Sequence, residues 1–225
     1  MLALVVNADI VKTPPADWAD LQAPEYKGSV ALAGDPRTSN QATMAIYAAG
    51  LSKGSADPAK TALDGLNFFA DLNKQGNFVP VVAGASSLAQ GVTPVVVLWD
   101  YNGLAARDNL KGNPKIEVVV PKSGVIAGVY VQAISAFAPH PAAAKLWMEH
   151  LYSDEGQIGW LKGYCHPIRF ADLVANNKAP ADVLAKLPAA ENYANAKFPT
   201  LAEQSAAKEV IATQWDKIVG AALAK

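Results

Sequence analysis

The sequence has little of several features that define common protein classes. Its 225 residues contain one cysteine, Cys165, which excludes an intrachain disulfide and is too few for a cysteine-based zinc cluster. Charged residues make up only 17% of the chain, with 19 basic against 20 acidic residues, and no run of like charges occurs. Such a chain lacks the electropositive footprint of a nucleic-acid or membrane-surface protein. We therefore expect no nucleic acid among its partners.

Long apolar runs are also missing. No stretch of about 18 uninterrupted apolar residues occurs, so a membrane-spanning helix is not expected. The apolar start of the chain has no basic leader, and Asn7 and Asp9 interrupt it too early for a signal peptide. We interpret Leu2–Val6 as a short buried strand instead.

The usual catalytic motifs are absent from the sequence. It has no Gly-x-Ser-x-Gly elbow, no phosphate loop, no dinucleotide fingerprint and no His-Glu-x-x-His pair. His140, His150 and His166 are too far apart for metal-ligand spacing. Cys165 and His166 are neighbours, but adjacent side chains usually point apart and no orienting acid is identifiable. We expect no catalytic residues, no metal and no cofactor, and hence a protein that is not an enzyme.

The most informative stretch is Pro94–Gly103. Its continuous apolar run, bounded by turn residues, predicts a strand buried on both faces, as in a helix-covered sheet. Trp99, Asp100, Tyr101 and Asn102 follow at the carboxyl end, where open α/β sheets bind ligands. We predict that these four residues line a binding site. The alternative is that Trp99 and Tyr101 cap the core and Asp100 starts a turn.

A second candidate site precedes the helix expected over residues 40–49, for which Gly50 is a plausible C-terminal cap. Thr38, Ser39, Asn40 and Gln41 lie at its start, where free backbone N–H groups and the helix dipole can bind an anion. The alternative is ordinary capping by Thr38 or Ser39, which most helices need in any case.

Strand and helix patterns alternate along the first part of the chain, and helices dominate after about residue 134. This order predicts an α/β fold with mainly parallel strand pairing. Further strands are expected over 29–33, 78–82 and 115–120, an extended stretch over 125–134, a loop over 164–170, and helices over 61–73, 86–90, 104–110, from 141, from 153 to about 163, 181–187 and 205–223.

Several segments together resemble the extracellular solute-binding proteins of ABC importers. Residues 15–28 resemble the family segment P-x-x-W-x-D-L-x-x-P-x-Y-K-G. The matching branch contains ferric-iron, thiamine, phosphonate, sugar-phosphate and polyamine binders. Further matches follow in order at residues 76–80, 94–102, 120–124, 138–145, 153–157 and 163–169.

The resemblance implies a type II periplasmic-binding fold, in which two α/β lobes are joined by crossing strands. Residues 11–121 would form the second lobe, and residues 1–10 and 122–225 the crossing strands and the C-terminal part of the first lobe. Leu2–Val6 resembles the first crossing and residues 125–134 the return. Family members normally carry a signal peptide and a further segment before the first crossing, so we expect the first lobe to be incomplete. Apolar helix faces left uncovered would favour association of two copies.

The resemblance also implies a function. The protein would be the substrate-binding component of an importer, capturing a small polar solute that is amine-bearing, zwitterionic or anionic, in an interlobe cleft by hinge closure. Its partners would be the solute and an ABC permease in the membrane, and its location periplasmic. No Tyr-Tyr pair occurs, which disfavours iron. Carried over by position, the solute contacts are Thr38, Ser39, Asn40, Trp99, Asp100, Tyr101, Asn102, Gly124 and Tyr130.

Two alternatives belong to other classes. One is a truncated remnant that binds no solute and associates with itself. The other is an enzyme on the same fold, which would require a catalytic constellation that the sequence does not contain.

Overall fold

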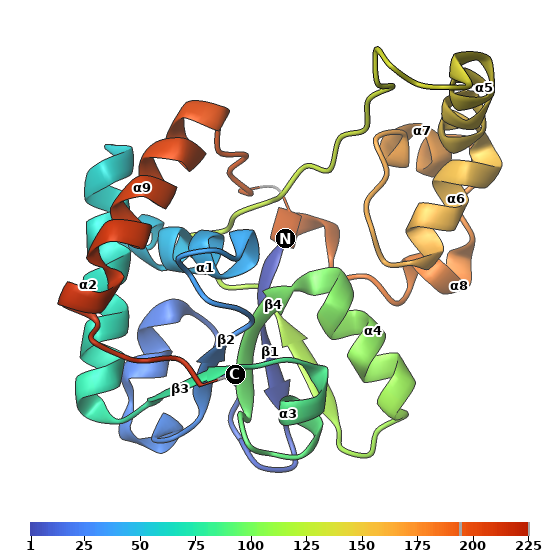
Figure 1. The fold of residues 1–225 in the computed structure, drawn as a ribbon. Helices are drawn as coiled ribbons and strands as arrows, with labels where there is room; N and C mark the ends of the chain where they lie inside the picture. Colours follow the sequence, from blue (N-terminus) through green and yellow to red (C-terminus); the bar gives the residue numbers. More distant parts are fainter. Residues whose placement is uncertain (194, 225) are drawn as a thin grey trace. The chain divides into compact units, whose positions relative to one another are not determined.

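The computed structural model describes residues 1–193 and 195–224 (Figure 1). Contacts within the chain divide it into two compact units. Unit 1 comprises Met1–Gly128 and Ala189–Lys225, and unit 2 comprises Val129–Pro188. The lobe boundaries that the resemblance implies stay a prediction.

Unit 1 contains a five-stranded sheet with the strand order β3-β2-β4-β1-β5. β2 pairs in parallel with β3 and β4, whereas β1 pairs antiparallel with both β4 and β5. The expectation of mainly parallel pairing is therefore wrong for β1. A strand buried on both faces has the same apolar composition in either pairing, so its direction is not readable from the pattern. The strands are β1 (Leu2–Asn7), β2 (Val30–Leu32), β3 (Phe78–Val82), β4 (Val95–Trp99) and β5 (Ile116–Val119).

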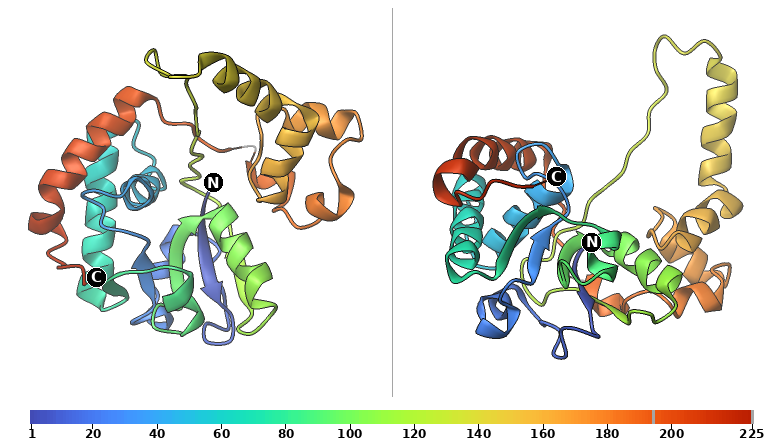
Figure 2. Two further views of the ribbon diagram at one scale, coloured as in Figure 1. Left: turned by 45° about the vertical axis from the view of Figure 1, so that its right-hand side comes forward. Right: turned by 60° about the horizontal axis from the view of Figure 1, so that its bottom comes forward.

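Helices cover both faces of this sheet (Figures 1 and 2). One face packs against α1, α2 and α9 together with the short helix η1, and the other packs against α3 and α4. The bounds are η1 (Trp18–Gln22), η2 (Pro24–Tyr26), α1 (Asn40–Leu51), α2 (Pro58–Gln75), α3 (Ala85–Ala89), α4 (Asp100–Leu110), η3 (Ala190–Tyr193) and α9 (Leu201–Ile218).

Side chains of β1 alternate between two hydrophobic clusters. Leu2, Leu4 and Val6 belong to the larger cluster on the α1 side, and Ala3 and Val5 to the smaller cluster on the α4 side. The alternation follows from the two-residue period of a strand. β4 is likewise buried along its whole length, which confirms the predicted strand with two buried faces.

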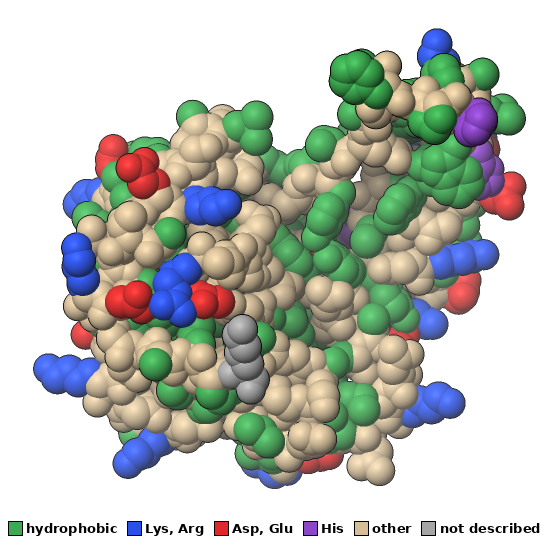
Figure 3. All heavy atoms as spheres, in the orientation of Figure 1, with side chains coloured by type: hydrophobic (Ala, Val, Ile, Leu, Met, Phe, Trp, Pro, Cys, Tyr) green, Lys and Arg blue, Asp and Glu red, His purple; other side chains and the backbone are tan. Residues whose placement is uncertain are grey.

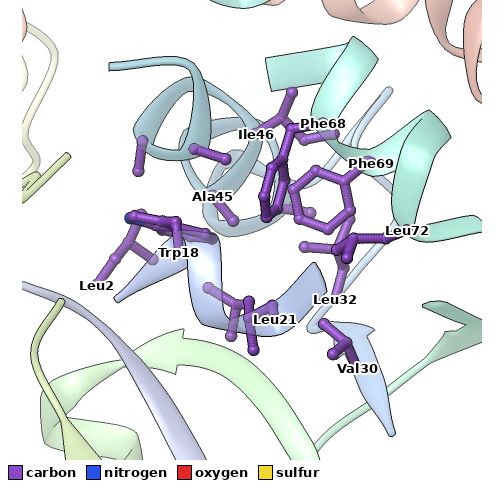
Figure 4. Close-up of a cluster of buried hydrophobic side chains, with 14 of the residues drawn as sticks. Leu2, Trp18, Leu21, Val30, Leu32, Ala45, Ile46, Phe68, Phe69 and Leu72 are labelled. Atoms are coloured by element: carbon purple, nitrogen blue, oxygen red, sulfur yellow. The ribbon is translucent and has the colours of Figure 1, made fainter. Parts of the chain in front are cut away.

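Aromatic side chains run through the larger cluster (Figure 4). Trp18 packs edge to face on Phe68, with ring centroids 6.2 Å apart, and Phe68 packs on Phe69 at 5.5 Å. Phe69, Phe78 and Trp215 continue the series at 5.7 and 6.1 Å. Because edge-to-face pairs add to the free energy gained by burial, this series ties η1, α2, β3 and α9 together.

Two glycines allow α1 and α2 to pack backbone to backbone. A Cβ atom on Gly50 would lie 1.8 Å from the carbonyl oxygen of Thr61, and one on Gly65 would lie 2.0 Å from that of Ile46. The prediction that Gly50 caps α1 is therefore wrong, since α1 continues to Leu51 and Gly50 serves helix packing instead.

Three further residues mark where helices begin or end. Gly76, with φ of 77°, ends α2. Asp17 caps η1, and its carboxylate also accepts a hydrogen bond of 2.8 Å from the Ser123 hydroxyl. α4 begins at Asp100, four residues before the expected start at Leu104.

The segment expected to be extended over residues 125–134 is not a regular strand. Only Ile126 forms a β-bridge, with Lys197. Lys197 N–H donates to the Val125 carbonyl at 2.8 Å, and Ala127 N–H donates to the Lys197 carbonyl at 2.9 Å. The two passages of the chain at the border of unit 1 are therefore hydrogen-bonded to each other.

Unit 2 is helical in the part of the chain that the structure describes. Arg169 links its helices by hydrogen bonds to Asp154, at 2.8 Å, and to Asp172. Hydrophobic side chains lie exposed over α5, among them Leu146 and Trp147, which are 72% and 60% exposed (Figure 3). The helices are α5 (Pro141–Tyr152), α6 (Asp154–Lys162), α7 (Phe170–Ala175) and α8 (Ala181–Leu184). Among the described residues of both units, no helix is long and apolar enough to cross a membrane.

We predict that Gly65→Ala destabilises unit 1 by about 2 kcal/mol or more, because the new methyl group would force α1 and α2 apart. Urea unfolding of the two proteins measures the difference. Gly84→Ala is the matched control, since nothing lies within 4 Å of the added Cβ and its φ of −168° suits any residue. Equal losses in the two variants would contradict the close-packing argument.

The hydrogen bonds at the start of α9 make a pH-dependent contribution to the free energy of unfolding. Glu203 accepts from Lys197 Nζ at 2.7 Å and from the Thr200 backbone N–H at 2.7 Å. These hydrogen bonds, led by the one from Lys197, lower the pKa of Glu203 to about 2. A lowered folded-state pKa stabilises the fold above the unfolded pKa of about 4.3, and this stabilisation is lost as the pH falls toward 2.

We therefore predict that Glu203→Gln lowers the free energy of unfolding at pH 7 by about 1 kcal/mol, because Gln keeps an acceptor for Thr200 but loses the charge. The difference from wild type should shrink between pH 5 and pH 2, as measured by urea titrations across that range. Glu209→Gln, at an exposed position of the same helix, is the matched control, since it also replaces a carboxylate of α9 by an amide.

Candidate functional site at the carboxyl edge of the sheet

One edge of the unit 1 sheet collects the segments that carry most of the predicted site residues. β2 and β4 run in parallel, so their carboxyl ends meet at this edge, and β1 begins there because it pairs antiparallel with β4. The loop after β2 leads into α1, and β4 leads directly into α4. Edges of this kind are where open α/β sheets place their ligands.

The loop after β2 is tightly folded onto the start of α1. The Ser39 hydroxyl accepts a hydrogen bond from Ala42 N–H at 3.5 Å, so Ser39 is the N-cap of α1. Gly34 has φ of 128°, and a Cβ there would lie 2.4 Å from Ser39 Oγ. Thr38 and Asn40 are exposed, whereas Ser39 is half-buried. Ser39 therefore acts as an ordinary helix cap, which was the alternative to a ligand role. Thr38 and Asn40 remain candidates for solute contact.

The guanidinium of Arg37 in this loop is held by two carboxylates. Its Nη2 lies 2.7 Å from Asp35 Oδ2, and its Nη1 lies 2.9 Å from Asp216 Oδ1 on α9. Hydrogen bonding to Asp35 raises the pKa of Arg37, so the group stays charged. Because both partners are acidic, the loop presents no free positive charge from Arg37 to an anion.

The corner after β4 is more buried than its polar composition suggests. Trp99 is 6% exposed and Asp100 4%, whereas Tyr101 is half-buried and Asn102 is exposed. Trp99 belongs to the larger hydrophobic cluster, and Tyr101 packs against it. A Cβ atom on Gly128 would lie 3.0 Å from the Trp99 ring, so the indole lies against that backbone.

Three donors surround the Asp100 carboxylate. The α-amino group of Met1 lies 2.7 Å from Oδ1, the Tyr101 backbone N–H donates to Oδ1 at 2.9 Å, and the Tyr193 hydroxyl donates to Oδ2 at 3.3 Å. Burial, and then the negative charge of Asp100, raise the pKa of Tyr193 well above its usual range. The tyrosine therefore stays a neutral donor, and the carboxylate is held in place as an acceptor for cationic and hydroxyl donors.

Gln41, in the first turn of α1, connects the two candidate segments. The sequence places it at the helix start, but the resemblance does not include it among the solute contacts. Its Oε1 accepts from Trp99 N–H at 2.9 Å, and its Nε2 donates to the Ala33 carbonyl at 3.3 Å. The position of Gln41 directly after the capping residues was the only signal in the sequence. A contact over 58 residues cannot be read from spacing.

The remaining two predicted residues lie elsewhere. Gly124, with φ of 59°, packs against the C-terminal half of α1, where a Cβ would lie 2.1 Å from the Ala48 carbonyl oxygen. Ser39 caps the opposite end of that helix, so the structure does not bring the two together. Tyr130 belongs to unit 2 and is 72% exposed.

A separate hollow of about 720 Å³ lies within unit 2, along α5 and α6, and its lining includes His150, Glu155, Trp160 and Lys162. It contains none of the predicted site residues. Across residues 1–193 and 195–224, no group of three or more His, Cys, Asp or Glu side chains is arranged to hold a metal ion.

Comparison with known proteins identifies the class. Residues 1–210 match the family model of the bacterial extracellular solute-binding proteins. The chain belongs to this family, as the resemblance implied.

Among curated relatives, the spermidine/putrescine-binding periplasmic protein of Escherichia coli (strain K12) is 33% identical over 149 residues, which are 63% of this chain and 39% of that protein. The protein of the same name from Salmonella typhimurium (strain LT2) is 32% identical over the same shares. The matched region thus spans about two fifths of these relatives. Their names are those of periplasmic binding proteins and not of enzymes.

Solved structures confirm the expected periplasmic-binding fold. An ABC transporter protein from Clostridium perfringens superposes with a TM-score of 0.66 at 19% identity, over 97% of this chain and 66% of that one. A spermidine/putrescine substrate-binding protein from Streptococcus pneumoniae gives 0.64 at 17% identity, over 97% and 67%. A periplasmic binding protein from Actinobacillus pleuropneumoniae, solved with fructose-6-phosphate, gives 0.59 at 19% identity, over 97% and 66%. The chain therefore spans about two thirds of these structures.

Proposed function

We propose that the protein is the solute-binding component of an ABC importer, which captures a small polar solute and delivers it to a permease in the membrane. The family match over residues 1–210 supports this proposal. A periplasmic location follows for this chain if it shares the compartment for which its curated relatives are named. Binding without chemical conversion agrees with the absence of a recognisable catalytic motif in the sequence.

We further propose that the solute carries an amine. The observation that carries this step is Asp100, a buried carboxylate beside Trp99 and Tyr101, which accepts hydrogen bonds from the Tyr101 backbone N–H and the Tyr193 hydroxyl. A carboxylate flanked by aromatic rings suits a primary amine through charge and cation–π attraction. A solute amine would bind there by replacing one of the donors that Asp100 holds in this structure.

Two observations favour an amine over a phosphate. Both curated relatives described above are named for spermidine and putrescine. Arg37, which a phosphate would otherwise attract, is already paired with Asp35 and Asp216. The N-terminus of α1 beside Thr38 and Asn40 still offers backbone donors, so a zwitterionic solute with a carboxylate remains within the proposal.

We predict that wild-type protein binds spermidine or putrescine and that Asp100→Asn weakens this binding by at least about tenfold, because the amide cannot neutralise an ammonium. Isothermal titration calorimetry measures both affinities. Asp216→Asn is the matched control, since it removes an acidic partner of Arg37 on an exposed part of α9, and it should bind as wild type does.

The outcomes separate the alternatives. Equal affinity of wild type and Asp100→Asn would remove Asp100 from the site. Binding of sugar phosphates or phosphonates but not of amines would indicate that the solute binds at the start of α1 and not at Asp100. A bound solute raises the melting temperature by mass action, so a thermal-shift screen in which amines, amino acids, phosphonates and sugar phosphates all have no effect would contradict the binding function.

The family match over residues 1–210 does not favour the alternative of self-association without solute. If two copies associate, the exposed apolar side chains over α5, including Leu146 and Trp147, are where we expect contact, because exposed apolar surface promotes contact between proteins. Analytical ultracentrifugation tests it: a homodimer that Leu146→Ser and Trp147→Ser convert to a monomer would support it, and a wild-type monomer at all concentrations would reject it.

A further inference from the structure

The hydrogen-bond ladder between β2 and β4 ends before the carboxyl edge of the sheet. The parallel register pairs Val30 with Val95, Ala31 with Val96 and Leu32 with Val97. At the start of the ladder, Val95 N–H donates to the Ser29 carbonyl at 2.9 Å. Successive rungs of a parallel ladder from one strand recur every second residue.

Extending this register beyond Leu32 and Val97 shows which backbone hydrogen bond should join β2 and β4 at the carboxyl edge. Four residues after Val95, the N–H of Trp99 should donate to the carbonyl of Ala33, four residues after Ser29. That direct bond is replaced by two bonds through one side chain. Trp99 N–H donates to Gln41 Oε1 at 2.9 Å, and Gln41 Nε2 donates to the Ala33 carbonyl at 3.3 Å.

We infer that Gln41 is a positioning residue whose carboxamide takes the place of a peptide group between β2 and β4. The inference deepens the proposed function and rests on it where solute binding is concerned. A carboxamide has the acceptor and the donor that the rung requires, and its insertion holds the two strand ends farther apart than a direct rung would. Glutamate has no donor for the Ala33 carbonyl, and alanine has neither group.

The position of this spacer determines what it separates. On one side lie Thr38, in the loop after β2, and Asn40, at the start of α1, and on the other lies the corner of Trp99 and Asp100. Ser39 Oγ also donates to the Ala33 carbonyl, at 3.4 Å, so the same carbonyl fixes the cap of α1. Gln41 therefore sets the spacing between the two segments proposed to contact solute, and the fold alone does not require it.

The first test compares the strand ends directly. In a crystal structure of Gln41→Ala, we expect the direct rung to form, with Trp99 N and the Ala33 carbonyl oxygen within about 3.2 Å. Gln41→Glu is the conservative variant. It keeps the bond from Trp99 N–H but sets an oxygen against the Ala33 carbonyl, so that bond alone should be lost. Strand ends that stay apart in Gln41→Ala, with water in place of the amide, would overturn the inference.

The second test separates positioning from stability. Calorimetry with spermidine should show at least about tenfold weaker binding for Gln41→Ala, whereas its melting temperature should change little because a direct rung replaces the lost bonds. Gln204→Ala is the matched control: it also removes a half-buried glutamine that donates to a backbone carbonyl, that of Pro199 at 2.8 Å, and it should retain wild-type affinity.

These two tests fail in different ways. If wild type binds no amine, the proposed solute is wrong, and the crystal structure of Gln41→Ala still decides whether the glutamine spaces the strands. If wild type binds spermidine and Gln41→Ala binds it equally well, the positioning role is wrong even though the proposed function stands. A fall in affinity that is matched by Gln204→Ala would likewise count against a specific role of Gln41.

Discussion

The three interior strands of the unit 1 sheet, β2, β4 and β1, have no exposed face, and this constraint shapes the rest of the unit. Each fully buried aliphatic side chain stabilises the fold by about 1.5–3 kcal/mol relative to exposure, provided that both faces of the sheet stay covered. Helices must therefore pack on both sides. The close approach of α1 and α2 at Gly50 and Gly65 is part of that cover.

The same constraint explains the polar arrangement at the carboxyl edge. Trp99 and Asp100 follow β4 directly, so both are buried with it, and buried polar groups are costly unless they are paired. The Trp99 N–H donates a hydrogen bond to the Gln41 side chain, and the Asp100 carboxylate accepts from three donors. A solute that enters here would exchange partners with groups that are already satisfied, which favours ligands that bring donors of the same kind.

The parts of the fold that the sequence predicts are those that depend on residues close together in the chain. Local signals were sufficient for β4, because its continuous apolar run predicts a strand with two buried faces without reference to distant residues. The antiparallel direction of β1 and the packing role of Gly50 depend on contacts with distant segments, which composition does not encode.

The candidate site shows the same division. Its place at the ends of β2 and β4 follows from the general architecture of α/β sheets, so the sequence could indicate it. The partners of its side chains could not be indicated, because Gln41 and Trp99 are 58 residues apart and Asp100 and Tyr193 are 93 apart. The ligand roles of the nine predicted residues remain predictions.

The bridge between Ile126 and Lys197 also bears on the modular history of the chain. Residues 129–188 are inserted within unit 1, and the stretches that flank them on either side come together, because the backbones of Val125–Ala127 and Lys197 are directly paired. A segment whose ends are adjacent can be exchanged, lengthened or excised with a short connecting turn, since closing a small gap costs little chain entropy. In topological terms, unit 2 is an insertion into unit 1.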